Sequence, residues 1–248
     1  MYFCVMAISS VELYNFVTNV LANKSQDGAI TIDQYNQACY AASLQLWEEY
    51  IGEVQNYRPG FASASSAYAR TNKIESDMAP FRIALLPITA NSSGVIDLTP
   101  LANYGYVTDL YRYQTIESQE VVFSGTRINE QRLANQLSSR VAPPTLEDPY
   151  FMVNNNTIKV FPASSSADYQ TYKITYLKKP DNRVVKYTIS GSGRPVITPV
   201  TAPTNPSEML EWNQQNFNDL AIIILSFLGV NLKDTELIQF SQLQQNNR

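Results

Sequence analysis

The spacing of apolar residues changes twice along this chain of 248 residues, and the change limits the folds open to it. Near both ends, apolar side chains recur at intervals of three and four residues, which is the spacing of one helix face. Between the ends, short runs rich in Val, Ile and Tyr alternate with turn residues, which is typical of antiparallel strands. The sequence therefore predicts an α+β fold, in which an N-terminal helical hairpin and C-terminal helices pack with a mostly antiparallel, sandwich-like β middle.

Two helices are predicted within residues 1–55. Ser9-x-x-Glu12 and Thr31-x-x-Gln34 both have the spacing of a capping box, in which two side chains satisfy free backbone N–H groups at a helix start. An apolar stripe at helical spacing follows each box, so we expect a helical hairpin. Cys39 lies on the second stripe, where a small core residue is favoured over a reactive thiol.

The turn between these helices carries a glycine where a calcium-binding helix–loop–helix would bend. Its first and last ligand positions, however, are Asn23 and Gln34 in place of Asp and Glu. Only Asp27 supplies a carboxylate at the ligand positions, and Ca²⁺ is a hard cation that carboxylates hold. A plain turn is therefore the favoured interpretation, and we expect neither a metal nor a cofactor.

The rest of the chain divides by composition into four segments. Residues 56–80 are rich in Ser and Ala and are expected to form a connection. Residues 81–190 are expected to form the β-rich middle, with a short helix near 128–138, a tight turn at Asn154-Asn155-Asn156 and a last strand at 184–189. Residues 191–205 are expected to be a long loop because glycine and proline are concentrated there. Residues 206–248 are expected to form C-terminal helices that pack with the hairpin, the last of them over 234–243. The first is expected to begin at Asn205-Pro206-Ser207-Glu208, which has the order of a helix start.

Composition excludes several classes of function. The chain has no histidine and only two cysteines, which excludes a Ser–His–Asp triad, imidazole-ligated zinc and a Cys-rich zinc site. The net charge of −4 argues against a surface that grips nucleic-acid phosphates. The most apolar run, Leu220 to Leu228, is shorter than the roughly 20 residues of a bilayer span. We expect no membrane segment and no export signal, and hence free thiols in a reducing cytoplasm.

Tyrosine is abundant, with 16 residues in the chain. Tyrosine is enriched at protein interfaces because it combines a large contact area with a polar tip, although the same residues could line the sheet edge of a monomer. The long loop is a second place where a neighbouring subunit could bind. The candidate interface residues are therefore Tyr104, Tyr106, Tyr111, Tyr113, Arg194, Pro195, Pro199 and Pro203.

Three stretches of the chain resemble virion structural proteins of crAss-like tailed bacteriophages. The first lies in the predicted hairpin, the second follows the short helix, and the third is near the C-terminus. They include DQYNQA at 33–38, IKVFP at 158–162, ITYLKKP at 174–180 and IILSFLGVNLKD at 223–234. The order of the three stretches is similar to that of head–tail adaptor and neck ring proteins, in which terminal helices bundle beside a β domain.

This resemblance implies a non-enzymatic subunit of a cyclic, twelve-fold oligomer that joins the portal to the tail and lets DNA pass. Its partners would be copies of itself, the portal and other neck or tail proteins, with only non-specific proximity to viral double-stranded DNA. It would be made in the cytoplasm of the host bacterium and end in the neck or tail region of the virion. Two alternatives stay open: a tail or capsid-surface protein that contacts a receptor or carbohydrate, and a hydrolase that uses Glu or Asp.

Overall fold

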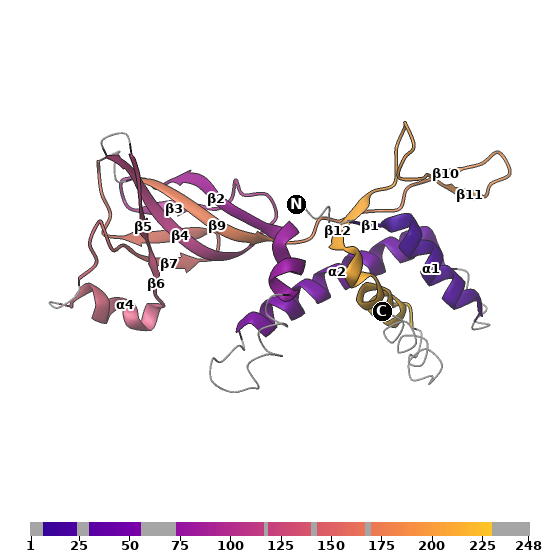
Figure 1. Cartoon of the computed structure of the whole chain (residues 1–248), viewed down its shortest axis with the longest axis horizontal. Coiled ribbons are helices and arrows are strands. Elements are labelled where there is room, and N and C mark those ends of the chain that lie inside the picture. The colour runs from indigo at the N-terminus through magenta and orange to yellow at the C-terminus, as the bar shows by residue number, and fades with distance from the viewer. Residues whose placement is uncertain are drawn as a thin grey trace. The chain divides into compact units, whose positions relative to one another are not determined.

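The computed structural model describes residues 7–23, 30–55, 73–116, 119–139, 143–166 and 170–229. The chain forms two compact units. Unit 1 combines residues 1–80 with residues 180–248, and unit 2 is the intervening segment, residues 81–179. Figure 1 shows the helical and the β-rich parts of the chain in the colours of the sequence.

The described part of unit 1 contains the helices α1 (Ser10–Asn23), α2 (Ile32–Gln55) and α5 (Phe217–Phe227), besides a short helical segment at 73–78. The capping box predicted at α2 is confirmed in full, whereas at α1 the Ser9 side chain makes its half of the box. The Glu12 N–H donates to Ser9 Oγ at 3.4 Å, and Thr31 and Gln34 exchange two hydrogen bonds of 3.0 and 3.2 Å. Gln34 therefore uses its amide as a cap. The loop residues 24–29 of the calcium-site hypothesis lie outside the described residues.

The three helices pack through aromatic edges. The rings of Tyr14 and Tyr35 join α1 to α2 at 5.0 Å between centroids, and those of Phe16 and Phe217 join α1 to α5 at 5.4 Å. α5 also packs against α2, as the sequence predicts for a C-terminal helix. Cys39 is buried in α2, and desolvation raises the pKa of its thiol to about 11, which confirms its prediction as a core residue.

The two ends of unit 1 are joined by a pair of short antiparallel strands. β1 (Ala7–Ser9) pairs with β12 (Met209–Asn213) in the register Ala7 to Asn213 and Ser9 to Met209. The helix start predicted at residues 205–208 is therefore wrong, because this segment leads into a strand. Leu210 and Trp212 are two residues apart, so their side chains lie on the same face of a strand and both are buried. The strand forms because β1 supplies its hydrogen-bonding partner. The helix begins only at Phe217, after the 3₁₀ turn η3 (Gln214–Asn216).

Unit 1 also has a polar centre. Residues 73–78 are helical and precede the 3₁₀ turn η1 (Ala79–Phe81). Asp77 is 1% exposed and accepts a 3.3 Å hydrogen bond from Asn213 Nδ2, while the hydroxyl of Tyr50 donates to Asn216 Oδ1 at 3.0 Å. These bonds connect the end of α2 and the helical residues 73–78 to residues 213–216, which lead into α5. The last predicted helix, residues 234–243, lies outside the described residues.

Unit 2 contains two four-stranded sheets, which confirms the antiparallel β middle. The first sheet has the order β2-β9-β4-β5 and is antiparallel, and the second has the order β3-β8-β7-β6, with only β6 and β7 parallel. Their strands are β2 (Arg82–Thr89), β3 (Val95–Asp97), β4 (Tyr104–Ile116), β5 (Gln119–Ser124), β6 (Thr126–Arg127), β7 (Tyr150–Asn154), β8 (Thr157–Phe161) and β9 (Thr171–Lys178). Asn155, at φ 46°, makes the predicted tight turn between β7 and β8.

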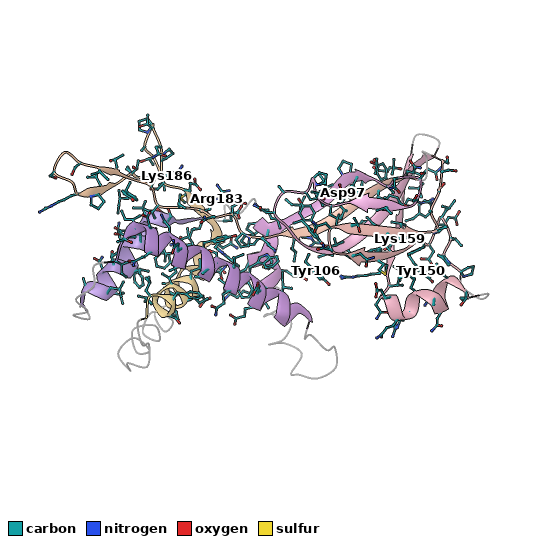
Figure 2. All side chains as sticks on the ribbon, turned by 180° about the vertical axis from the view of Figure 1, so that it is seen from behind. Asp97, Tyr106, Tyr150, Lys159, Arg183 and Lys186 are labelled. Carbon is teal, nitrogen blue, oxygen red and sulfur yellow. The ribbon has the colours of Figure 1, made fainter. Side chains whose placement is uncertain are left out.

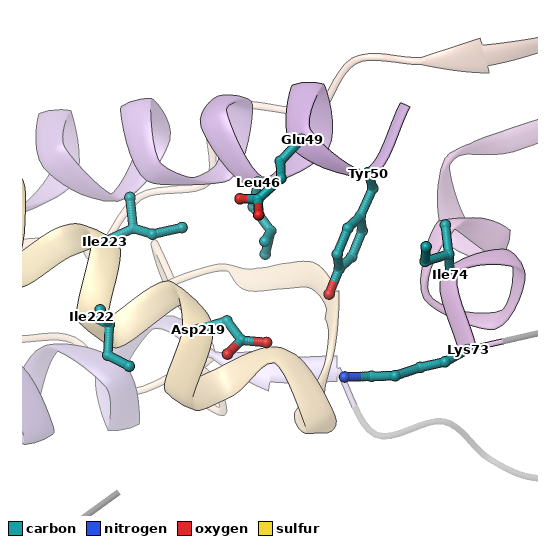
Figure 3. A pocket seen from close by; sticks show the side chains of 8 residues that line it. All are labelled: Leu46, Glu49, Tyr50, Lys73, Ile74, Asp219, Ile222 and Ile223. Atoms are coloured by element: carbon teal, nitrogen blue, oxygen red, sulfur yellow. The ribbon is translucent and has the colours of Figure 1, made fainter. Parts of the chain in front are cut away.

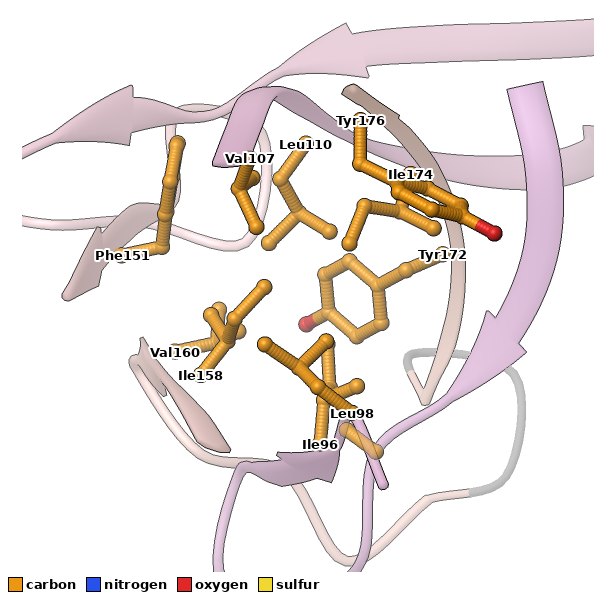
Figure 4. Packing of buried hydrophobic residues seen from close by; sticks show 11 residues of the cluster. Ile96, Leu98, Val107, Leu110, Phe151, Ile158, Val160, Tyr172, Ile174 and Tyr176 are labelled. Carbon is orange, nitrogen blue, oxygen red and sulfur yellow. The ribbon is translucent and has the colours of Figure 1, made fainter. Parts of the chain in front are cut away.

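One hydrophobic core serves both sheets of unit 2. Figure 4 shows Leu110 and Ile174 of the first sheet facing Ile96, Ile158 and Val160 of the second, all with 1% exposure or less. The two sheets therefore pack as a sandwich, as the alternation of apolar residues predicts. The short helix predicted near 128–138 is also present, as α4 (Glu130–Leu137).

The β-rich segment ends earlier than the sequence indicates. Unit 2 closes at Lys179, and the segment predicted as its last strand instead contributes β10 (Tyr187–Ile189) to unit 1. The expected long loop over 191–205 is also partly wrong, because β11 (Pro195–Ile197) lies inside it and pairs antiparallel with β10. Glycine and proline here mark a hairpin turn with a strand beside it.

Gly94 provides a test of the close packing in unit 2. Its φ is +73°, and a Cβ built there would lie 2.6 Å from the carbonyl oxygen of Val160. We expect Gly94→Ala to lower the free energy of unfolding of unit 2 by about 1–2 kcal/mol or more, measured by urea denaturation. The control Gly52→Ala, in α2 with no atom within 4 Å of the added carbon, should raise stability by about 0.5–1 kcal/mol. An unchanged Gly94→Ala transition would contradict this packing.

Candidate interaction surface

A two-stranded arm extends from the helices of unit 1. We define the arm as residues 187–197, which comprise β10, its turn and β11 (Figure 1). Its cross-strand pairs are Tyr187 with Ile197, Thr188 with Val196, and Ile189 with Pro195. A hairpin of this length is marginally stable by itself in water, so contacts at its base must hold it in place.

The tip of the arm is closed by side-chain and backbone bonds. Ser190 Oγ donates to the carbonyl of Arg194 at 2.9 Å and accepts from the Arg194 N–H at 3.2 Å. Gly193 has a φ of +76° and donates its N–H to the Ser190 carbonyl at 2.8 Å. The turn is therefore defined by its own residues, and the Arg194 side chain extends from an ordered position.

The base of the arm is held by α2. The Asn36 amide donates to the Val185 carbonyl at 3.1 Å and accepts from the Val185 N–H at 2.9 Å. One side chain thus satisfies both backbone groups of a residue next to β10, as a neighbouring strand would do. The Tyr187 hydroxyl also donates to Asp33 Oδ2 at 3.3 Å, and this carboxylate raises the pKa of Tyr187 above its ordinary value.

Ser207 fastens the other end of the arm. Its Oγ accepts from the Lys186 N–H at 2.9 Å and also contacts the carbonyl of Thr198, so it joins the residues on either side of the arm. The Thr198 N–H donates to the Lys186 carbonyl at 2.8 Å. The predicted role of Ser207 in a helix start is therefore replaced by a role in closing the hairpin.

Ion pairs connect the segment before the arm to the segment around β12. Arg183 lies 2.9 Å from Asp181 and 3.5 Å from Glu211, and Lys186 lies 3.2 Å from Glu208. Figure 2 shows Arg183 and Lys186 near the root of the arm. Each such pair is worth little alone, but several together orient the chain where it enters β12.

The arm exposes apolar side chains on both faces. Ile189 is 72% exposed and Val196 is 51% exposed. They belong to opposite faces because the pairs Ile189–Pro195 and Thr188–Val196 are adjacent, and successive pairs alternate between the faces. Arg194 is also exposed, and its guanidinium forms no ion pair with any described residue. An ordered ribbon with exposed apolar residues and one free cation is typical of a surface that binds a protein.

Unit 1 also contains a pocket of about 340 Å³. Its walls come from the second half of α2, from the helical residues 73–78 and from α5, as Figure 3 shows. Apolar and charged side chains share the lining, which consists of Leu46, Glu49, Tyr50, Lys73, Ile74, Asp219, Ile222 and Ile223. The pocket is thus an apolar hollow with two carboxylates and one ammonium group.

The pKa of Asp219, one of the two pocket carboxylates, is raised above its ordinary value. Burial raises the pKa of its carboxyl, the charge of Lys73 lowers it in part, and the nearby Asp77 raises it further. Figure 3 shows the side chains of Asp219 and Lys73 directed toward one another, yet they form no ion pair within 4 Å. The pocket therefore keeps a partly desolvated carboxylate without a direct cationic partner among the described residues.

The four candidate tyrosines all lie on β4 of unit 2, where each is partly buried. Two rings are covered by cations: Arg127 lies over Tyr106 at 5.1 Å from the centroid, and Lys173 over Tyr113 at 4.6 Å. Tyr104 packs against Tyr176 at 6.3 Å. Three of the four rings therefore make contacts inside unit 2, that of Tyr106 with a residue of the second sheet.

The predicted interface residues therefore divide between the two units. The four tyrosines belong to unit 2, whereas Arg194 and Pro195 lie on the arm and Pro199 and Pro203 in the exposed loop after it. Sequence reasoning missed the residues that anchor the arm and those that line the pocket. Asn36 gives no signal in the sequence because it occupies a polar helix face, and Asp219 is one of many acidic residues.

In the described ranges no group of three or more His, Cys, Asp or Glu side chains is arranged to hold a metal ion. None of the described helices is long and apolar enough to span a bilayer.

The amide of Asn36 tests the anchoring of the arm. We expect Asn36→Ala to leave the helices and the sandwich folded, because the amide bonds to Val185, which lies just before the arm. Hydrogen–deuterium exchange at residues 184–198 should accelerate about tenfold, since the two lost bonds are worth about 1 kcal/mol or more. The matched control is Gln37→Ala, which removes the neighbouring exposed amide and should leave this exchange unchanged. Equal exchange in both variants would contradict the anchoring role.

The charge balance of the pocket predicts how Asp219 titrates. Its pKa is raised in the folded state, so the stability it contributes is full below its ordinary value near 3.8 and is lost as pH rises through the folded-state pKa. Lys73→Gln should raise this pKa further, because it removes the group that lowers it. Carboxyl ¹³C NMR titration measures the shift, with Lys159→Gln in unit 2 as the control. A fall in the Asp219 pKa in Lys73→Gln would refute the assigned balance.

Comparisons with known proteins do not assign the chain to a family. No protein-family model matches it, and a search of curated proteins found no match. The resemblance to phage neck proteins therefore stays a prediction.

Proposed function

We propose that this chain is a structural subunit of a phage virion neck, a ring-forming connector that joins the portal to the tail. The observation that carries the proposal is the arm: an ordered, anchored hairpin with exposed apolar residues on both faces. An exposed ribbon of this kind costs solubility in a monomer, whereas in an assembly its apolar residues become buried.

A ring is expected in place of a symmetric dimer if the arm of one copy contacts a different surface of the next. The arm and the pocket are different surfaces, and contacts between different surfaces of identical subunits propagate from one copy to the next. If the rotation per copy closes, the product is a ring. A central channel suits the passage of DNA when it does not attract phosphates, and the net charge of −4 agrees with that requirement.

The β4 tyrosines give less support to the alternative of a carbohydrate-binding or receptor-binding protein. Such a protein needs open aromatic faces on which a sugar ring can stack. One face of Tyr106 is instead occupied by Arg127, and one face of Tyr113 by Lys173. We therefore prefer the connector.

The proposal predicts the place of this chain in assembled particles. Mass spectrometry of purified virions should find it in a fixed ratio to the portal protein, and electron microscopy of particles tagged at Arg248 should place the tag at the neck. Particles that carry the protein on the capsid or at the tail tip would refute a connector.

The arm and the loop after it should be required for incorporation. A variant that lacks residues 192–204 is expected to fold, because this segment lies outside the helices and the sandwich, but to be missing from particles. Circular dichroism and hydrogen exchange check the fold, and immunoblots of virions measure incorporation. Normal incorporation of this variant would show that the arm is not the assembly element.

A further inference from the structure

We propose that the arm of one copy of this chain inserts into the pocket of the next copy, with Arg194 beside Asp219. This inference deepens the proposed function, because it names the surfaces through which neighbouring subunits join. It rests on the position, charge and polarity of two features of unit 1.

The arm and the pocket lie at opposite ends of α2. The arm is held by Asp33 and Asn36 at the beginning of α2, whereas Leu46, Glu49 and Tyr50 line the pocket near its end. About thirteen residues separate the two places, which is about 20 Å along a helix that rises 1.5 Å per residue. The arm is anchored away from the pocket of its own chain, so its binding there requires a second copy.

The arm and the pocket carry opposite charges. The arm carries one charged side chain, Arg194, and this cation has no ion-pair partner among the described residues. The pocket presents Asp219 and Glu49 against one cation, Lys73, and the buried Asp77 adds negative charge behind Asp219. The arm is therefore positive where the pocket is negative, and a charge-assisted hydrogen bond in a partly desolvated place is stronger than one at an open surface.

Both the arm and the pocket also present apolar side chains. Ile189 and Pro195 are cross-strand neighbours next to Arg194, and Ile189 is 72% exposed. The pocket offers Leu46, Ile74 and the 40% exposed Ile222. A volume of about 340 Å³ is at the lower end of ligand pockets and suits a few side chains. The contact would be smaller than a standard interface, so we expect weak association between free subunits.

A disulfide cross-linking experiment tests the pairing at low affinity. In a Cys4→Ser background, one protein carries Ser192→Cys at the tip of the arm and a second carries Ile222→Cys at the pocket. Mixed and oxidised, they should form a cross-linked dimer in at least tenfold greater yield than when the second protein carries Gln37→Cys, which is exposed near the other end of α2. Buried Cys39 serves as an internal check that the fold is intact, because it should stay unmodified.

A double-mutant cycle then tests the proposed pair of charges. Arg194→Ala in the arm protein and Asp219→Asn in the pocket protein should each lower the initial cross-linking rate about tenfold, and the two together no further. Arg194→Lys should retain most of the rate. Cross-linking at the Gln37→Cys level would overturn the arm-and-pocket contact, and effects that multiply to about a hundredfold would overturn the pairing of Arg194 with Asp219.

The outcome is separable from that of the proposed function. Failure of the cross-link with the protein still found at the virion neck would remove only this contact. Success of the cross-link with the protein missing from the neck would leave the self-association and remove the connector.

Discussion

The joining of the two chain ends into unit 1 is the constraint on which the other features depend. β1 pairs with β12, α5 packs on α1 and α2, and Tyr50 bonds to Asn216 across 166 positions of sequence. Because these contacts are non-local, unit 2 is inserted between two segments that must meet again. The same contacts create the pocket, whose walls come from three segments far apart in the chain.

The division into two separately cored units has a consequence for the assembly. Unit 2 is a sandwich whose apolar residues face one shared core, and the rings of Tyr106 and Tyr113 contact cations of the same unit. Unit 1 instead carries the ordered arm and the charged pocket. In the proposed connector, unit 1 would therefore provide the contacts between neighbouring copies, and unit 2 would be available for other virion proteins.

Polar side chains do much of the positioning in unit 1. Asn36 takes the place of a strand edge for Val185, and Ser207 joins the two sides of the arm. Asn213 reaches Asp77, which fixes the 73–78 helix next to α5. Buried hydrogen bonds of this kind contribute only about 1 kcal/mol each, but leaving one partner unsatisfied costs more. These bonds therefore favour a single arrangement of the segments in unit 1. Hydrophobic contact alone, which has no direction, would allow several arrangements.

The sequence by itself determined the local elements with strong signals: the two capped helices, the short helix α4, the Asn-rich turn and the alternating strands of the sandwich. Each depends on residues near one another in the chain, so pattern and capping suffice to predict it. Only the tertiary structure decided that residues 209–213 are a strand and that the proline-rich segment contains β11. It also decided that Asn36 anchors the arm and that Glu49 and Asp219 line the pocket. A strand or a pocket of this kind exists only when a distant segment supplies the other half, and a single sequence carries no local mark of that partner.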